Sequence, residues 1–143
     1  MSELLSQSER SLIYKELDNN GEDNLIWKVC GHANNDITEL ENEFNITSNL
    51  AVEGVRKPVK RGVFQNKEAF AYQYLNGSPL SEVISKGAMA PGSVYSIALS
   101  IVQTLKQLHQ NGVFHLRLNP ANIIYNPRNK EVYIIDFSIA TKD

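Results

Sequence analysis

Residues 112–138, GVFHLRLNPANIIYNPRNKEVYIIDFS, bring together several side chains that could do chemistry. Asp136 ends an apolar strand and Asn122 lies in a loop, and their carboxylate and amide oxygens are hard ligands of the kind that Mg²⁺ prefers. Arg117 cannot act as a base, because its guanidinium stays protonated at any accessible pH. The alternative is that Asn122 and Asp136 merely cap turns.

The spacing of these residues resembles the catalytic core of the eukaryotic-type protein kinases. His115, Leu118 and Asn122 have the spacing of the catalytic-loop motif H-R-D-L-x-x-x-N, and D-F-S at residues 136–138 stands where the family has D-F-G. The resemblance implies that Asp136 and Asn122 hold the magnesium ion of a bound nucleotide. It also implies that His115 is a structural residue that braces the loop.

Upstream, the family has a strand lysine that reaches the α- and β-phosphates and a helix glutamate that orients it. Lys28, in LIWKVC, takes the place of the lysine. Glu43 lies one turn after Leu40 and borders the apolar face of its helix, so its carboxylate can turn inward. We expect Lys28 and Glu43 to form an ion pair, because each is costly near an apolar face without a partner. The alternative is a solvated lysine and an exposed glutamate.

The segment FAYQYLNGSPL, residues 70–80, resembles the hinge between the two lobes of a kinase. The resemblance places Tyr72 behind the adenine of ATP and gives the backbone groups of Gln73 and Leu75 hydrogen bonds to the base. ATP and Mg²⁺ are therefore the ligands that the resemblance implies.

Two features depart from the family pattern. The glycine-rich loop should fall near SQSERSLIY, residues 6–14, but the first glycine is Gly21, so no backbone of minimal bulk can fold over the phosphates. Arg117 stands where the family has the aspartate that accepts the proton of the substrate hydroxyl. Such a base contributes about 10²- to 10⁴-fold in rate. The Arg117 cation would also compete with magnesium for Asp136.

The glycine-poor loop and the sequence NPAN at residues 119–122 are most similar to the bacterial kinase-like domains that open very large sensor proteins, ahead of an AAA-type ATPase module, a GAF module and often a histidine kinase. The resemblance runs over residues 3–143 but covers only the first half of a kinase domain. We therefore expect a kinase-like N-lobe over residues 1–75, followed by the hinge and the start of a truncated C-lobe over residues 76–143.

Local patterns predict the elements that must position these residues. Residues 11–17 and 24–30 are β-branched and aromatic runs around a turn signal at 19–21, which indicates a hairpin. A helix with Asp36 as a candidate N-cap follows at 35–46. Further predicted elements are strands at 57–64 and 68–75, a short helix from Ser78, a long helix at 93–110, and strands at 122–125 and 132–136. This order predicts an α+β fold, with a mostly antiparallel N-lobe containing one long helix, then the first helices and catalytic-loop hairpin of a helical C-lobe.

Composition limits the classes of function. The 143 residues are 42% hydrophobic and 21% charged, as in one globular domain. The 14 basic and 16 acidic residues are mixed along the chain, so there is no basic stripe for nucleic acid. Cys30 is the only cysteine, which excludes an internal disulfide. No signal peptide or membrane span is recognisable, and a cytoplasmic protein is expected.

Three functions remain open. The first is a pseudokinase that keeps some capacity for nucleotide and regulates a protein partner or further domains of a larger signalling protein. The second is an active serine/threonine kinase that transfers the γ-phosphate of ATP to protein. The third is an interaction domain that binds no nucleotide. Arg117 favours the first over the second, and binding of an ATP analogue separates the first from the third.

Overall fold

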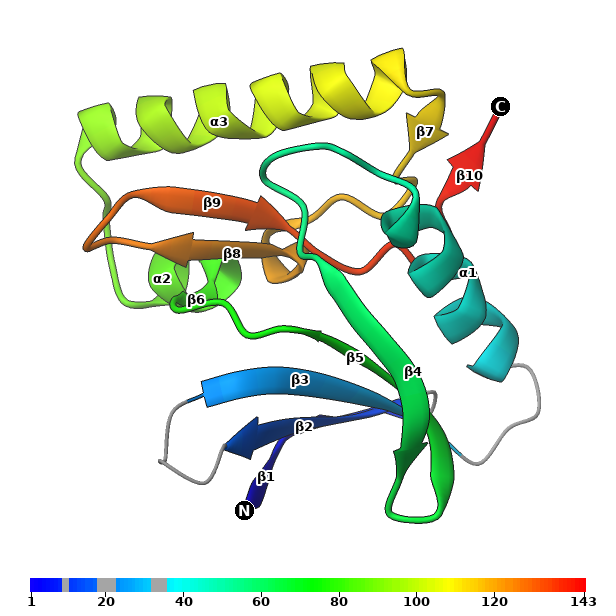
Figure 1. The fold of residues 1–143 in the computed structure, drawn as a ribbon. Coiled ribbons are helices and arrows are strands. Elements are labelled where there is room, and N and C mark those ends of the chain that lie inside the picture. The colour runs from blue at the N-terminus through cyan, green and yellow to red at the C-terminus, as the bar shows by residue number, and fades with distance from the viewer. Residues whose placement is uncertain (9–10, 18–22, 32–35) are drawn as a thin grey trace.

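The computed structural model describes residues 1–8, 11–17, 23–31 and 36–143 (Figure 1). The front of the chain forms a five-stranded sheet in the order β1-β2-β3-β5-β4, in which every neighbouring pair is antiparallel. Its strands are β1 (Ser2–Gln7), β2 (Ser11–Leu17), β3 (Asp23–Cys30), β4 (Pro58–Phe64) and β5 (Lys67–Gln73). The predicted turn at 19–21 lies outside the described residues.

Helix α1 (Asp36–Ser48) packs against the sheet through Leu40, which contacts Phe70 and Tyr72 of β5. The same side of the helix buries Glu43, one turn after Leu40, so a carboxylate faces the interior beside an apolar contact. The predicted helix is confirmed. The side chain of Asp36, the predicted N-cap, is not among those described.

The rest of the chain forms helices over two small sheets. A three-stranded sheet has the order β6-β8-β9, and β10 pairs with β7. Figure 1 shows α3 running along β8 and β9, with β10 at the chain end beside β7. The elements are β6 (Ser78–Pro79), α2 (Leu80–Ser85), α3 (Pro91–Gln110), β7 (Val113–Phe114), the 3-10 turn η1 (Pro120–Asn122), β8 (Ile123–Asn126), β9 (Glu131–Ile134) and β10 (Thr141–Lys142).

The predicted α+β fold class is confirmed, with corrections to individual elements: β7 and β10 were not predicted, and α3 begins at Pro91 rather than at residue 93. The short helix begins at Leu80 rather than Ser78, because residues 78 and 79 pair with β8 and extend the hairpin sheet. Strand β1 was not predicted, because all six of its residues are exposed and the segment therefore shows no alternation of apolar and polar residues. The division of the chain at residue 75 stays a prediction.

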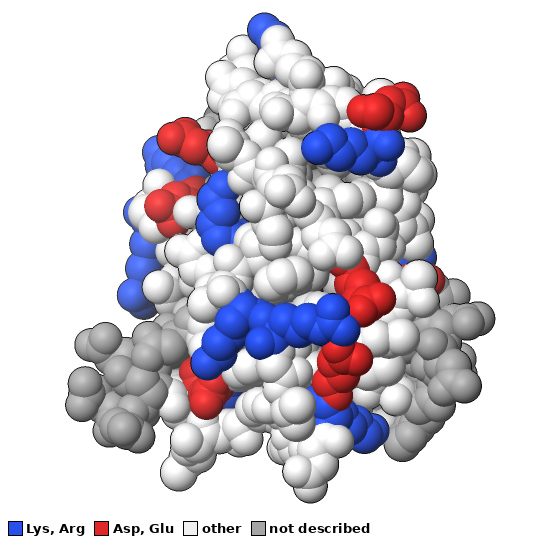
Figure 2. Space-filling view, turned by 45° about the vertical axis from the view of Figure 1, so that its right-hand side comes forward, with Lys and Arg blue, Asp and Glu red and all other residues white. Residues whose placement is uncertain are grey.

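The surface carries both apolar and charged areas. On α3, Val94, Tyr95 and Val102 are 51%, 72% and 60% exposed, so this helix carries large apolar side chains on its surface. Figure 2 shows one face on which acidic and basic side chains are interspersed rather than segregated. In the described ranges, no helix combines the length and the hydropathy that a membrane crossing requires.

Candidate functional site

His115 braces the loop that leads into the 3-10 turn η1. The side chain is 3% exposed, and its Nδ1 accepts a hydrogen bond of 3.2 Å from the backbone N–H of Arg117. The ring proton therefore lies on Nε2, which donates to the carbonyl of Ile135 at 2.9 Å. The ring also meets Phe137 edge-on, with 4.7 Å between centroids. The prediction that His115 braces this loop is confirmed, and the brace fixes Arg117 beside the residue that follows Ile135.

Asn122 and Asn119 hold the carbonyl of Arg117 from the other side. Their Nδ2 atoms donate to this oxygen at 2.9 Å and 3.1 Å, respectively. The Oδ1 of Asn119 also accepts from the backbone N–H of Ala121 at 2.9 Å and caps η1. Asn122 thus fixes the loop with its amide nitrogen, and its Oδ1 is the atom left to accept a ligand.

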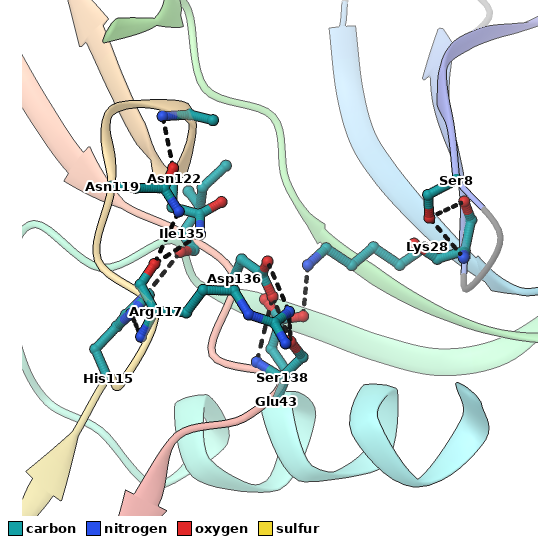
Figure 3. A network of polar contacts seen from close by, with 12 residues as sticks. Ser8, Lys28, Glu43, His115, Arg117, Asn119, Asn122, Ile135, Asp136 and Ser138 are labelled. Carbon is teal, nitrogen blue, oxygen red and sulfur yellow. Dashed lines mark hydrogen bonds and ion pairs between the residues drawn. The ribbon is translucent and has the colours of Figure 1, made fainter. Parts of the chain in front are cut away.

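Asp136 lies two residues after the end of β9 and contacts Arg117 and Ser138 (Figure 3). Its backbone is in the left-handed region with φ of 65°, which aspartate tolerates better than most residues. Oδ1 accepts hydrogen bonds from the Ser138 backbone N–H at 3.3 Å and from its hydroxyl at 2.6 Å. Oδ2 lies 3.9 Å from Nη1 of Arg117, which also donates to the Ser138 hydroxyl at 3.3 Å. One cation and one hydroxyl therefore orient the carboxylate.

The surroundings of Asp136 favour its charged form. Burial pushes the pKa of this carboxyl upward, but the charge of Lys28, the two hydrogen bonds from Ser138 and the charge of Arg117 outweigh burial, so the pKa lies below the usual value. Asp136 is therefore an anion at neutral pH, suited to bind a cation.

Lys28 and Glu43 form the predicted ion pair, with 2.5 Å between Nζ and Oε2. The two residues are 5% and 2% exposed, so the alternative of a solvated lysine and an exposed glutamate is wrong. Lys28 comes from the middle of β3, between Ile13 of β2 and Phe70 of β5. In Figure 3 its side chain crosses from β3 toward Glu43 on α1 and toward Asp136.

One cavity of about 360 Å³, a size typical of small-molecule sites, is lined by Lys28, Glu43, Asn122 and Asp136. The prediction that Asp136 and Asn122 face one cavity is confirmed. As far as the chain is described, no three His, Cys, Asp or Glu side chains gather as a metal cluster. The lining also includes Glu39, Leu40, Arg56, Arg117 and the serines 6, 8 and 11 from the β1–β2 end of the sheet.

The three residues predicted to contact adenine are not in the lining of this cavity. Tyr72 and Leu75 are 1% and 9% exposed, and burial raises the pKa of the Tyr72 phenol far above its usual range. Gln73 lines a separate pocket together with Glu53 and Lys57. The backbone N–H of Gln73 donates to the Lys57 carbonyl at 2.9 Å. Their roles in base binding stay predictions.

Two residues of the site were not predicted from the sequence. Arg56, which precedes β4, is 7% exposed and lines the cavity. The amide of Asn42 donates to the carbonyls of Ser138 and Ala140 at 3.0 Å and 2.9 Å, so α1 holds the segment that follows Asp136. No local pattern marks either residue, because both act on segments far away in the sequence.

Known proteins resemble this chain over most of its length. Residues 5–142 match the family model of the protein kinase domain. Over 69 residues, 48% of the chain, it is 35% identical to the serine/threonine-protein kinase PknB of Mycobacterium leprae and 33% identical to a probable serine/threonine-protein kinase of Streptomyces coelicolor. Over 112 residues, 76% of the chain, it is 24% identical to the serine/threonine-protein kinase pkn2 of Myxococcus xanthus.

These matches cover 11%, 10% and 14% of the three relatives, so the chain spans a small part of their length. The family match extends over nearly the whole chain. Within it, Lys28 of β3 pairs with Glu43 of α1, and both line one cavity together with Asn122 and Asp136. On the family match and this arrangement together, the chain belongs to the protein kinase family.

Proposed function

We propose that this chain is a nucleotide-responsive regulatory module that does not transfer phosphate, a pseudokinase. The observation that carries the proposal is the position of Arg117, whose guanidinium lies in the cavity 3.9 Å from the Asp136 carboxylate. At this place in the loop the family has its proton acceptor, and a guanidinium accepts no proton at any accessible pH.

In this proposal the cavity binds the phosphates of ATP. Lys28, oriented by Glu43, contacts phosphate oxygens, while Asp136 and the Oδ1 of Asn122 are the ligands available to Mg²⁺. When bound, the metal ion neutralises phosphate charge. The adenine lies against Tyr72, with the Gln73 carbonyl and the Leu75 backbone as its hydrogen-bonding partners.

The donor atoms fit Mg²⁺, but the surrounding charge opposes it. A carboxylate and an amide oxygen are suitable hard ligands. However, a second cation at Asp136 would share the carboxylate with Arg117, whose Nη1 is already 3.9 Å from Oδ2. Arg117 also offers fixed positive charge beside the phosphates. ATP is therefore expected to bind with little dependence on magnesium.

The biological role follows from the same chemistry. A domain that binds nucleotide without transferring its phosphate can signal the presence of nucleotide to a protein partner or to further domains of a larger cytoplasmic signalling protein. The similarity of its glycine-poor loop to the bacterial sensor proteins suggests neighbours of the AAA-type ATPase and GAF kinds.

An active kinase is the second candidate, favoured by the retention of Lys28, Glu43, Asn122 and Asp136 around one cavity. A transfer assay separates the two candidates. The 143-residue chain is incubated with γ-labelled ATP, Mg²⁺ and casein, next to Asp136→Ala, while a fluorescent ATP analogue measures binding.

The proposal predicts binding of the analogue and no transfer above the level of the Asp136→Ala variant. Transfer by the unmodified chain that is lost in Asp136→Ala would favour the active kinase. If the analogue fails to bind both with and without magnesium, the interaction domain is the better account.

A further inference from the structure

Arg56 is a buried cation that has no counter-ion among the described residues. The residue is 7% exposed, and within the described residues neither Nε nor Nη2 has a hydrogen-bond partner. The guanidinium lies over the ring of Tyr72 at 5.1 Å, and the hydroxyl of Tyr72 is also buried without a partner in the described chain. Buried polar groups are nearly always paired, so two neighbouring exceptions call for a ligand or another functional explanation.

The acidic side chains of the cavity do not neutralise Arg56. Glu43 is held by Lys28 at 2.5 Å, and Asp136 lies 3.9 Å from Arg117. Among the residues that the structure describes, no carboxylate lies within ion-pair distance of Arg56. Glu39, the third acidic residue of the lining, therefore does not pair with it either.

Two cations of the cavity, Lys28 and Arg56, lie near the ring of Tyr72. Nζ of Lys28 lies 5.7 Å from the centre of the same ring that Arg56 covers. Burial lowers the pKa of Arg56 although Glu43, Tyr72 and Asp136 attract its charge. The guanidinium is thus held where burial disfavours its charge, and an ionisable group perturbed in this way in a cleft is a candidate for a binding site.

We infer that Arg56 forms a phosphate-binding end of this cavity. A phosphate group offers several charged acceptor oxygens, and a planar guanidinium can donate to two of them at once. Binding there would satisfy the donors of Arg56 and place its charge next to an anion, with Lys28 as the neighbouring cation. The inference rests on the proposed function, since it takes the same cavity to be the nucleotide site.

The test compares three variants in EDTA, without divalent cations. Arg56→Met removes the charge and keeps a side chain of similar length. Arg56→Lys keeps the charge but removes the planar guanidinium that can donate to two oxygens at once. Arg61→Met is the matched control, because Arg61 is an exposed arginine of β4 that pairs with Glu41 and Glu68 outside the cavity. Affinities for ATP, inorganic triphosphate and adenosine are measured by calorimetry, and the urea midpoint of each ligand-free protein is recorded.

We expect Arg56→Met to weaken the binding of ATP and of triphosphate at least tenfold, the effect of one charge-assisted hydrogen bond or more. The affinity for adenosine should stay within twofold of the parent. The affinities of Arg56→Lys for ATP and triphosphate should lie between those of Arg56→Met and the parent, and those of Arg61→Met should equal those of the parent. The urea midpoint of Arg56→Met should equal or exceed that of the parent, because an unpaired buried charge is removed.

Three results would overturn the inference. If the parent binds ATP and triphosphate and the affinities of Arg56→Met for both stay within twofold of the parent, Arg56 does not contact phosphate, and the proposed function stands. A lower urea midpoint for Arg56→Met would mean that Arg56 stabilises the fold instead. A parent that binds neither ligand, with or without magnesium, would remove the proposed function as well.

Discussion

Breaking the buried pair of Lys28 and Glu43 should have unequal effects on stability, depending on which partner is removed. Loss of one partner of a buried ion pair costs about 3–5 kcal/mol, because the other charge stays in a medium of low dielectric constant. Glu43→Gln leaves Lys28 and Arg56 as buried cations, and we expect the full cost. After Lys28→Met, the charge of Arg56 still attracts Glu43, so a smaller cost of about 1–3 kcal/mol is expected.

Urea unfolding measures both changes. With a slope of about 2 kcal/mol per molar urea, Glu43→Gln should lower the midpoint by about 2 M and Lys28→Met by about 1 M. Trp27 is the only tryptophan, is 5% exposed and adjoins Lys28 in β3, so its fluorescence reports on this part of the sheet.

Arg61→Met is again the control, since it breaks a surface network whose arginine side chain is 52% exposed, and little change in midpoint is expected. A midpoint for Glu43→Gln no lower than that of Arg61→Met would refute the buried-charge argument. A larger loss for Lys28→Met than for Glu43→Gln would refute the role given to Arg56.

Two further predictions concern Asp136 and Gly54. Because the folded-state pKa of Asp136 lies below its usual value of 3.8, the stability that this carboxylate contributes is present above pH 3.8 and is lost as pH falls through the folded-state pKa. Between pH 7 and pH 2, the urea midpoint of Asp136→Asn should therefore fall less steeply than that of the parent. An equally steep fall in both proteins would contradict this. Gly54 has φ of 78°, and a Cβ there would lie 2.4 Å from Oγ1 of Thr104. Gly54→Ala should therefore destabilise the parent more than it does a Thr104→Ala background, where left-handed strain of about 1–2 kcal/mol remains; equal costs in urea unfolding would count against the clash.

The sequence predicted those parts of the site that depend on spacing within one segment. Asn122 and Asp136 lie at the ends of one short hairpin, so a motif in a single stretch brings them together. Lys28 and Glu43 could be paired because each interrupts an apolar face, and burial then requires a partner of opposite charge.

Other parts depend on contacts between distant segments. Arg56 acquires its surroundings from Tyr72 on β5 and from α1, and nothing within its own segment distinguishes it from a surface arginine. The amide of Asn42 meets a carbonyl 96 residues away. Strand β1 is held by pairing with β2 while its side chains stay exposed, so its hydrogen bonds leave no pattern in the sequence.

The most direct test of the central claim is the ratio of ATP dissociation constants in EDTA and in Mg²⁺, compared between the parent and Arg117→Asp. Arg128→Asp, in the turn between β8 and β9, makes the same charge change away from the cavity and is the control. Because Arg117 already supplies fixed charge beside the phosphates, the parent and the control should show ratios below about tenfold. Arg117→Asp should raise the ratio at least tenfold without restoring phosphotransfer, since a second carboxylate repels free ATP and offers a ligand to the metal. An equal ratio in the parent and Arg117→Asp, or binding by the parent only with magnesium, would contradict the account.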